Sequence, residues 1–122
     1  MKFDTEILGV LPMKALKFLV LAVGAGFALT AAVADEAPQG LVLKDHKFSP
    51  SIIRVRANQP TIISLTNHDD TAEEFDSTAL KVEKVVASGA SGNIRLRPLA
   101  PGRYPFMGEF HSETAQGVVI AE

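Results

Sequence analysis

The sequence contains no cysteine, no tryptophan and a single tyrosine among its 122 residues. Without cysteine the chain can form no disulfide bond, and it can offer no thiolate to a metal ion or a substrate. Glycine-rich phosphate loops and motif-spaced pairs of catalytic carboxylates are also absent, and no serine lies in a G-x-S-x-G context. The chain is therefore poorly equipped for hydrolytic chemistry.

One apolar run stands out, close to the N-terminus. Lys14 and Lys17 precede the apolar residues 18–30, and the small residues 32–34 (Ala-Val-Ala) form a cleavage site. This pattern predicts a secretory signal peptide over residues 1–34, with Met13 as the true start, and hence a periplasmic protein. The run is shorter than the roughly 20 residues of a membrane-spanning helix. An uncleaved N-terminal anchor is the alternative.

Cleavage would leave 88 residues with a net charge near −3. We expect a short polar leader over 35–39 and one domain over 40–122. A chain of this size can bury enough surface for a core without disulfides, and its mild acidity argues against nucleic-acid binding.

Hydrophobic residues alternate with polar ones along most of the domain. The period of two is clear in "SIIRVRAN", "PTIISLTN" and "GNIRLRPL", and turn signals such as Ser49-Pro50 and Pro101-Gly102 separate the runs. Regular short strands with such punctuation predict an all-β fold, a Greek-key β-sandwich of seven or eight strands. In the segment 71–80 we expect a helical turn or a long excursion.

Candidate metal ligands lie in two places. The stretch "YPFMGEFHSETAQG", 104–117, brings Met107 and His111 close together among carboxylates, and His46 ends the first predicted strand. A polar turn with one histidine is the alternative for 104–117, and a surface position is the alternative for His46. His68, in "TNHDD", is expected to be solvated.

The second acidic element is "EEFD", 73–76. Phe75 should be buried, which by alternation places Glu74 and Asp76 on the opposite face. A buried carboxylate needs a cation, a proton or hydrogen bonds, and a solvated edge is the alternative. Tyr104 is expected to have its ring in the core and its hydroxyl bonded to the backbone.

Taken together, these stretches resemble the cupredoxin fold. "LVLKDHKFSPSIIRVRANQPTIISLTN" is similar to its opening, and "LAPGRYPFMGEFH…QGVVIAE" is similar to its close. Within the superfamily, "NHDDTAEEFDSTALKVEKVV" resembles the EfeO-type cupredoxin-like domains of bacterial high-affinity iron uptake, in their free-standing periplasmic form. The chain departs from the blue-copper pattern: Gly108 stands at the cysteine position, Glu74 lies near the first histidine position, and the axial methionine is missing.

The resemblance implies a copper site with His111 and Glu74 as ligands, Met107 as a soft donor and His46 reaching in from the first turn. Such a set of ligands suits both oxidation states of copper. It lacks the copper–thiolate bond of blue-copper sites. The other carboxylates could form a second, oxygen-rich site for iron, with a solvated acidic rim as the alternative: Glu73, Asp76, Glu83, Glu109 and Glu113.

The function implied is that of a periplasmic non-blue copper protein accessory to iron uptake. It would oxidise Fe(II), or pass electrons or metal to an inner-membrane iron permease or a periplasmic iron-binding protein. We expect a metal-binding or electron-transfer protein rather than a stand-alone enzyme. A metal-free binding or scaffold module, or a copper chaperone unrelated to iron, is the alternative.

Overall fold

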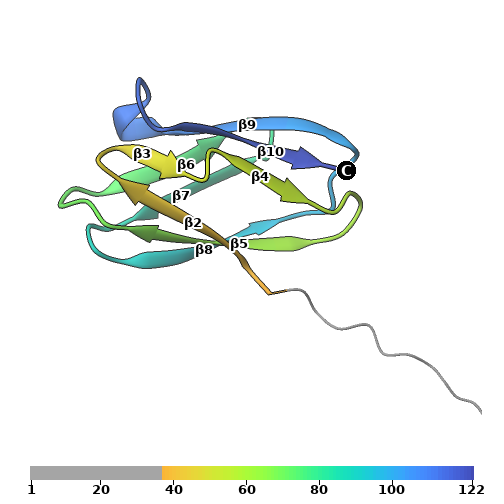
Figure 1. The fold of residues 1–122 in the computed structure, drawn as a ribbon, viewed down its shortest axis with the longest axis horizontal. Coiled ribbons are helices and arrows are strands. Elements are labelled where there is room, and N and C mark those ends of the chain that lie inside the picture. Colours follow the sequence, from red (N-terminus) through yellow and green to blue (C-terminus); the bar gives the residue numbers. More distant parts are fainter. Residues whose placement is uncertain (1–36) are drawn as a thin grey trace, which may run out of the picture. The chain divides into compact units, whose positions relative to one another are not determined.

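In the computed structural model, which describes residues 37–122, nine β-strands form two packed sheets (Figure 1). The strands are β2 (Gln39–Lys44), β3 (Lys47–Ser49), β4 (Ile52–Val55), β5 (Thr61–Asn67), β6 (Glu73–Ser77), β7 (Val82–Val86), β8 (Ser91–Leu96), β9 (Gly102–Gly108) and β10 (Gln116–Ala121). A short 3₁₀ helix, η2 (Glu109–His111), follows β9. Within residues 37–122 no helix has the length and hydropathy needed to span a bilayer.

Each sheet contains one parallel pair among antiparallel ones. The five-stranded sheet has the order β4-β10-β9-β6-β7, with β10 parallel to β4, and the four-stranded sheet has the order β3-β2-β5-β8, with β2 parallel to β5. The last strand therefore lies inside the larger sheet, between an early strand and β9. This arrangement brings the β9–β10 connection next to the early part of the chain.

The core lies between the sheets and follows the alternation of the sequence. In β5 the buried residues Ile63 and Leu65 alternate with partly exposed ones, and in β6 Phe75 is wholly buried. Phe75 stacks on Phe106 of β9 with ring centroids 4.7 Å apart, and Phe48 meets both rings edge-on. Such aromatic contacts add to the stability gained by burying apolar surface.

The predicted all-β sandwich is confirmed, with nine strands instead of seven or eight. One addition is the three-residue β3; the other is β6, in the segment where a helical turn or an excursion was expected. That expectation was wrong for 73–77, because Phe75 and its neighbours pair with both β7 and β9. The predicted signal peptide, the start at Met13 and the first two residues of the leader lie outside the described residues.

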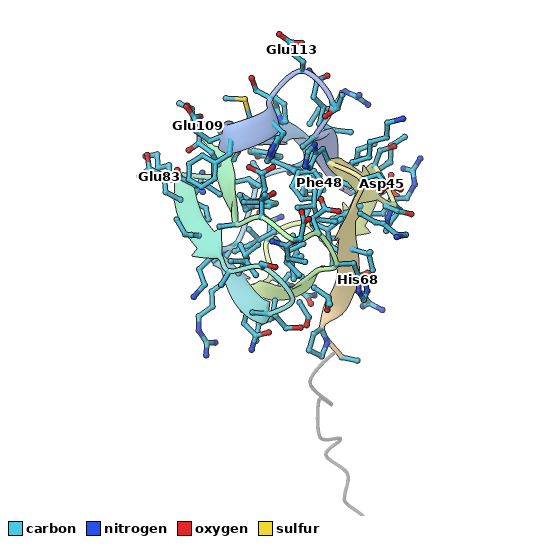
Figure 2. The ribbon with its side chains drawn as sticks, turned by 90° about the vertical axis from the view of Figure 1, so that its left-hand side faces the viewer. Asp45, Phe48, His68, Glu83, Glu109 and Glu113 are labelled. Carbon is cyan, nitrogen blue, oxygen red and sulfur yellow. The ribbon has the colours of Figure 1, made fainter. Side chains whose placement is uncertain are left out.

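One end of the sandwich gathers the β2–β3 turn, the β5–β6 loop, the β7–β8 turn and the η2 segment. Figure 2 looks onto this end, where Asp45 and His68 lie on two of the connections and Glu109 and Glu113 lie on the one between β9 and β10. The backbone N–H of His68 donates to the carbonyl of Leu43 over 2.8 Å, which ties the β5–β6 loop to β2. Both histidines that were predicted as ligands, His46 and His111, lie at this end.

Candidate metal centre

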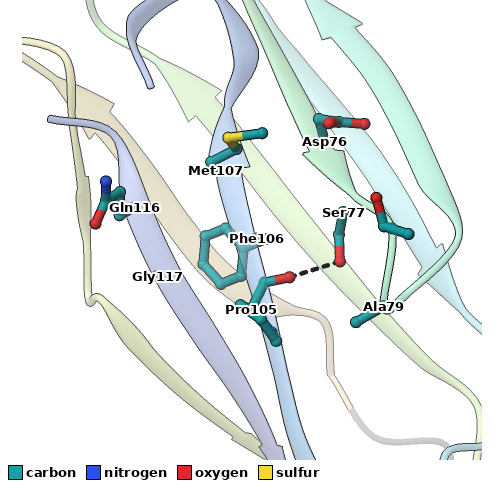
Figure 3. Close-up of a pocket in the computed structure, with 9 residues that line it drawn as sticks. Asp76, Ser77, Ala79, Pro105, Phe106, Met107, Gln116 and Gly117 are labelled. Carbon is teal, nitrogen blue, oxygen red and sulfur yellow. Dashed lines mark hydrogen bonds between the residues drawn. The ribbon is translucent and has the colours of Figure 1, made fainter. Parts of the chain in front are cut away.

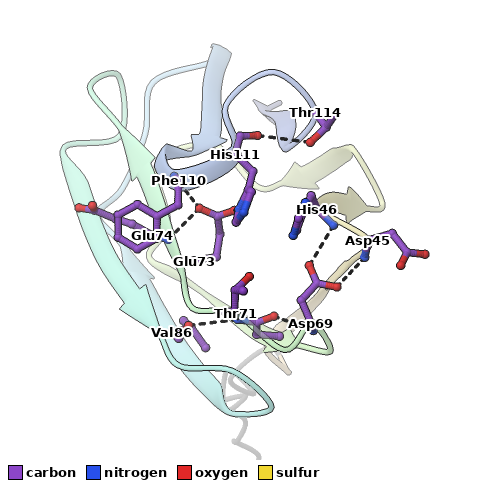
Figure 4. Close-up of polar contacts among 11 residues, drawn as sticks. Asp45, His46, Asp69, Thr71, Glu73, Glu74, Val86, Phe110, His111 and Thr114 are labelled. Carbon is purple, nitrogen blue, oxygen red and sulfur yellow. Dashed lines mark hydrogen bonds and ion pairs between the residues drawn. The ribbon is translucent and has the colours of Figure 1, made fainter.

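A buried carboxylate and an imidazole form the centre of this end. His111 Nδ1 lies 2.7 Å from Oε2 of Glu73, whose side chain is fully buried while that of His111 is about one quarter exposed. The other carboxylate oxygen, Oε1, accepts the backbone N–H groups of Phe110 (2.8 Å) and Glu74 (3.0 Å). If the carboxylate is ionised it can only accept hydrogen bonds, and the donor of this contact is then Nδ1–H of His111. Both oxygens of Glu73 are thus satisfied by the chain itself (Figure 4).

Gly108 makes room for this carboxylate. A Cβ atom at position 108 would lie 2.6 Å from Cδ of Glu73, 2.7 Å from its Oε2 and 2.8 Å from Cβ of Ala115. Non-bonded carbon atoms prefer separations of about 3.5–4.0 Å. No side chain fits at position 108 while Glu73 is in place, so the carboxylate takes the space that a cysteine side chain would enter.

His46 covers His111 from the β2–β3 turn. The two imidazole rings are stacked, with centroids 3.6 Å apart and planes inclined by 14°. His46 and the preceding Asp45 have left-handed backbone angles, φ 59° and φ 53°. The tight two-residue turn between β2 and β3 requires such angles, and it points the His46 side chain at the centre.

Asp69 holds this turn from the β5–β6 loop. Its carboxylate accepts the backbone N–H groups of Asp45 (2.6 Å) and His46 (2.9 Å). Partial burial acts to raise the pKa of Asp69, but these two hydrogen bonds and the charges of His46 and Lys44 outweigh it, so the pKa is lowered. The carboxylate is therefore well suited to remain ionised and to keep accepting both bonds.

The other two predicted ligands lie on the opposite face of the larger sheet. Because Phe75 and Phe106 point into the core, their neighbours Glu74 and Met107 point outward and are partly exposed. Met107 lines a shallow groove of about 340 Å³ on that face together with Asp76 (Figure 3). The structure brings His46 and His111 together, and it does not bring Glu74 or Met107 to them.

Glu73 was expected only in the second, acidic site, and its pairing with His111 is what sequence reasoning missed. Glu73 lies one position before Glu74 and two before Phe75, so alternation places it on the buried face. That signal was present in the sequence, but the resemblance favoured Glu74. Two further expectations agree with the structure: His68 is exposed, and the Tyr104 hydroxyl donates to the carbonyl of Ala100 over 2.6 Å.

The carboxylates predicted to form a second, iron-binding site do not all lie together. Asp76 and Glu83, opposite each other on β6 and β7, lie with Glu74 so that one oxygen of each is within 4.8 Å of the others. Partial burial raises the pKa of Glu74, and the charges of Glu83, Asp76 and Glu109 raise it further. Glu73 is not part of this outer group, because its oxygens bond to His111 and two backbone amides.

The inner pair suits a metal ion with nitrogen and oxygen ligands. Two donors on one ion, each about 2.0 Å from it, lie about 2.8–3.3 Å apart, close to the 2.7 Å between His111 Nδ1 and Glu73 Oε2. Imidazole and carboxylate are ligands that Cu(II) accepts. The lone pair of an imidazole nitrogen lies in the plane of its ring, and the two stacked rings are nearly parallel. Their lone pairs therefore do not meet at one point, and His46 would have to turn to share an ion with His111. The residues fit a non-blue copper ion, and metal binding itself stays a prediction.

Comparison with a known protein sequence gives a bacterial relative. A stretch of 80 residues is 46% identical to the uncharacterized protein RP394 of Rickettsia prowazekii (strain Madrid E). The match covers 66% of this chain and 64% of that relative, so the chain spans less than two thirds of the relative's length.

Solved structures with the same fold include copper proteins. Auracyanin A, a blue copper protein from Chloroflexus aurantiacus, superposes with a TM-score of 0.60 at 12% identity, over 70% of this chain and 98% of its own. The metal-binding domain of the Cu(I)-exporting P-type ATPase CopA of Streptococcus pneumoniae D39, solved with Cu(I), has a TM-score of 0.61 at 14% identity, over 68% of this chain and 82% of its own. At these identities the likeness shows the fold alone. The model of the cupredoxin-like domain family matches residues 17–121, and the chain belongs to that family.

Proposed function

We propose that this protein is an exported, non-blue copper-binding member of its family, with Glu73 and His111 as ligands and His46 beside them. One observation carries the proposal: a buried carboxylate and an imidazole 2.7 Å apart, covered by a second imidazole, at the loop end of the sandwich. Relatives of this fold bind copper.

The donor set favours Cu(II) more than the sequence suggested. Met107, the soft donor that was expected to support Cu(I), points away from His111, and residues 37–122 contain no thiolate. Carboxylate and imidazole are harder ligands. Bound copper would supply a one-electron Cu(II)/Cu(I) couple. The chain's part is to keep the Glu73 carboxylate buried and hydrogen-bonded, and to leave His111 partly exposed at the end of the sandwich.

The role in iron uptake and the periplasmic location are the finer parts of the proposal. They are supported by the resemblance of "NHDDTAEEFDSTALKVEKVV" to the EfeO-type domains and by the signal-peptide pattern. In that role the protein would oxidise Fe(II), or pass electrons or metal to an inner-membrane permease or a periplasmic iron-binding protein. The test is the rate of Fe(II) oxidation by the copper-loaded protein. A rate no higher than that of free copper would remove the oxidase role.

A metal-free binding module is the second candidate, and one observation favours it. Both oxygens of Glu73 already accept hydrogen bonds from the chain, so the buried charge is compensated without an ion. An entering ion would have to replace at least the bond from His111.

The deciding experiment is a calorimetric titration of Cu(II) into the purified protein and four variants. Glu73→Gln and His111→Ala change the inner pair, whereas Glu74→Gln and Met107→Leu change the two outward residues at the same strand ends. We expect the first two to weaken Cu(II) binding by at least about tenfold, and the other two to leave it unchanged. Nitrogen hyperfine coupling in the EPR spectrum should disappear or shrink in His111→Ala.

The controls also decide between the two candidates. Circular dichroism should show that each variant is folded before its affinity is compared. Cu(II) binding that is lost in Glu74→Gln and retained in Glu73→Gln would contradict the inner site. An absence of binding in the unmodified protein would favour the metal-free module.

A further inference from the structure

The β2–β3 turn that carries His46 has an unusual backbone. Asp45 and His46 both adopt left-handed angles, which side chains other than glycine disfavour. Turns of this kind more often contain glycine and asparagine. A histidine at the second turn position therefore needs additional support from its surroundings.

That support comes from Asp69, 23 residues further along the chain. Its two carboxylate oxygens accept separate bonds, Oδ1 from the N–H of Asp45 (2.6 Å) and Oδ2 from the N–H of His46 (2.9 Å). Within residues 37–122 the imidazole of His46 makes no hydrogen bond, and its ring contact is the stack on His111. The direction of the His46 ring is thus set by the turn and the stack.

Asp69 is itself fixed by the body of the fold. Its backbone N–H donates to Oδ1 of Asn67 over 2.9 Å, and its carbonyl accepts the hydroxyl of Ser88 over 2.8 Å. Asn67 is fully buried, and its Nδ2 group donates to the carbonyls of Thr71 and Val86. Since Asn67 lies on β5 and Val86 on β7, the anchor bridges the two sheets.

We propose that Asp69 is the positioning residue that holds His46 over His111. Its carboxylate locks the left-handed turn, and the turn places the second imidazole beside the Glu73–His111 pair. The consequence for metal binding rests on the proposed function. The geometric part, in which the stack depends on Asp69, holds for the metal-free protein as well.

The test uses two substitutions of Asp69 and a matched control in the same loop. Asp69→Ala removes both acceptors, and Asp69→Asn keeps one carbonyl oxygen. Asp70→Ala removes the neighbouring carboxylate, which is exposed and makes no hydrogen bond within the described residues. In the metal-free protein we expect the nuclear Overhauser effects between the His46 and His111 rings to vanish in Asp69→Ala and weaken in Asp69→Asn. They should be unchanged in Asp70→Ala.

A second readout uses Cu(II) titration. Asp69→Ala should weaken Cu(II) binding by about tenfold to a hundredfold, the effect of losing a residue that orients a ligand, because the released turn no longer keeps His46 close enough to rotate toward an ion on His111. In a His46→Ala background the same substitution should have no further effect on Cu(II) affinity. If Asp69→Ala acted through a general loss of structure, it would lower the affinity in that background as well. If Asp69→Ala does not fold, Asp69→Asn supplies both measurements.

Two results separate failure of this inference from failure of the proposed function. Ring contacts and Cu(II) affinity that are as strong in the Asp69 variants as in Asp70→Ala would overturn the positioning role. Ring contacts that are lost in Asp69→Ala, in a protein that binds no Cu(II) at all, would support the role of Asp69 and refute the copper site.

Discussion

Replacing Gly108 by alanine tests whether the buried carboxylate really fills the space beside β9. The new methyl group would lie 2.6 Å from Cδ of Glu73 and 2.8 Å from Cβ of Ala115, and both neighbours are buried. Overpacking of this kind costs about 1–3 kcal/mol. Moving Glu73 away from its three donors adds about 1–3 kcal/mol, because it disturbs a buried charge.

The loss of glycine's backbone freedom acts in the opposite direction and stabilises the fold. Gly108 has extended backbone angles, φ −92° and ψ 113°, which alanine adopts without strain. Alanine therefore reduces the entropy of the unfolded chain and stabilises the fold by about 0.4–1 kcal/mol. The middle of these ranges gives a net loss of about 3 kcal/mol in the free energy of unfolding. For a domain of this size, that lowers Tm by roughly 10–25 °C.

The assay is equilibrium urea unfolding followed by far-UV circular dichroism, because the chain has no tryptophan to serve as a fluorescence probe. Gly40→Ala is the matched control, since Gly40 also lies in a strand and nothing is within 4 Å of its added Cβ. In a Glu73→Ala background the Gly108→Ala penalty should shrink, which a double-mutant cycle measures. Equal effects of the Gly108 and Gly40 substitutions would refute the reasoning.

Three other perturbations have defined outcomes. Glu74 binds its proton more tightly in the folded protein than in the unfolded chain, so stability falls as pH rises from the ordinary glutamate pKa, about 4.3, through the raised folded value. Glu74→Gln should remove that loss of stability. Urea midpoints that fall equally with rising pH in the variant and the wild type would contradict the raised pKa of Glu74. Asn67→Ala removes three hydrogen bonds of a fully buried side chain and should cost about 2–4 kcal/mol in urea unfolding. A loss below about 1 kcal/mol would mean that water replaces them. Arg54→Ala should change thermal stability by less than about 0.5 kcal/mol, because its ion pair with Glu122 is 60% exposed on each side, and a larger loss would assign Arg54 a packing role.

The strands could be predicted because most of them alternate cleanly between turn signals. The longer of the two strands that were missed, β6, has charged residues on both sides of Phe75, and one of them, Glu73, is buried. A buried glutamate breaks the apolar pattern by which inward positions are recognised. The stretch therefore appeared irregular, although Phe75 alone fixes which of its residues point inward.

The sequence allowed individual residues of the candidate site to be predicted, but not how they lie relative to one another. His46 and His111 could be selected as residues near strand ends, but their stacking depends on a left-handed turn held by a carboxylate 23 residues away. Such a contact leaves no local signature in the sequence. Glu73 and Met107 are different cases, because alternation from Phe75 and Phe106 already assigns one inward and the other outward. There, periodicity indicates which way each side chain points, which the motif resemblance does not.

Gly108 explains why this end of the sandwich has the donors it has. A cysteine at position 108 and the carboxylate of Glu73 exclude each other, since even the first side-chain carbon at 108 would lie within 2.7 Å of an oxygen of Glu73. A thiolate site and the Glu73–His111 pair therefore cannot coexist in one conformation of this end. The chain lacks cysteine altogether, and the space is filled by a charged group with three donors of its own. In place of a thiolate this end has a carboxylate–imidazole pair, whose harder donors would suit Cu(II) without the copper–thiolate bond of a blue site.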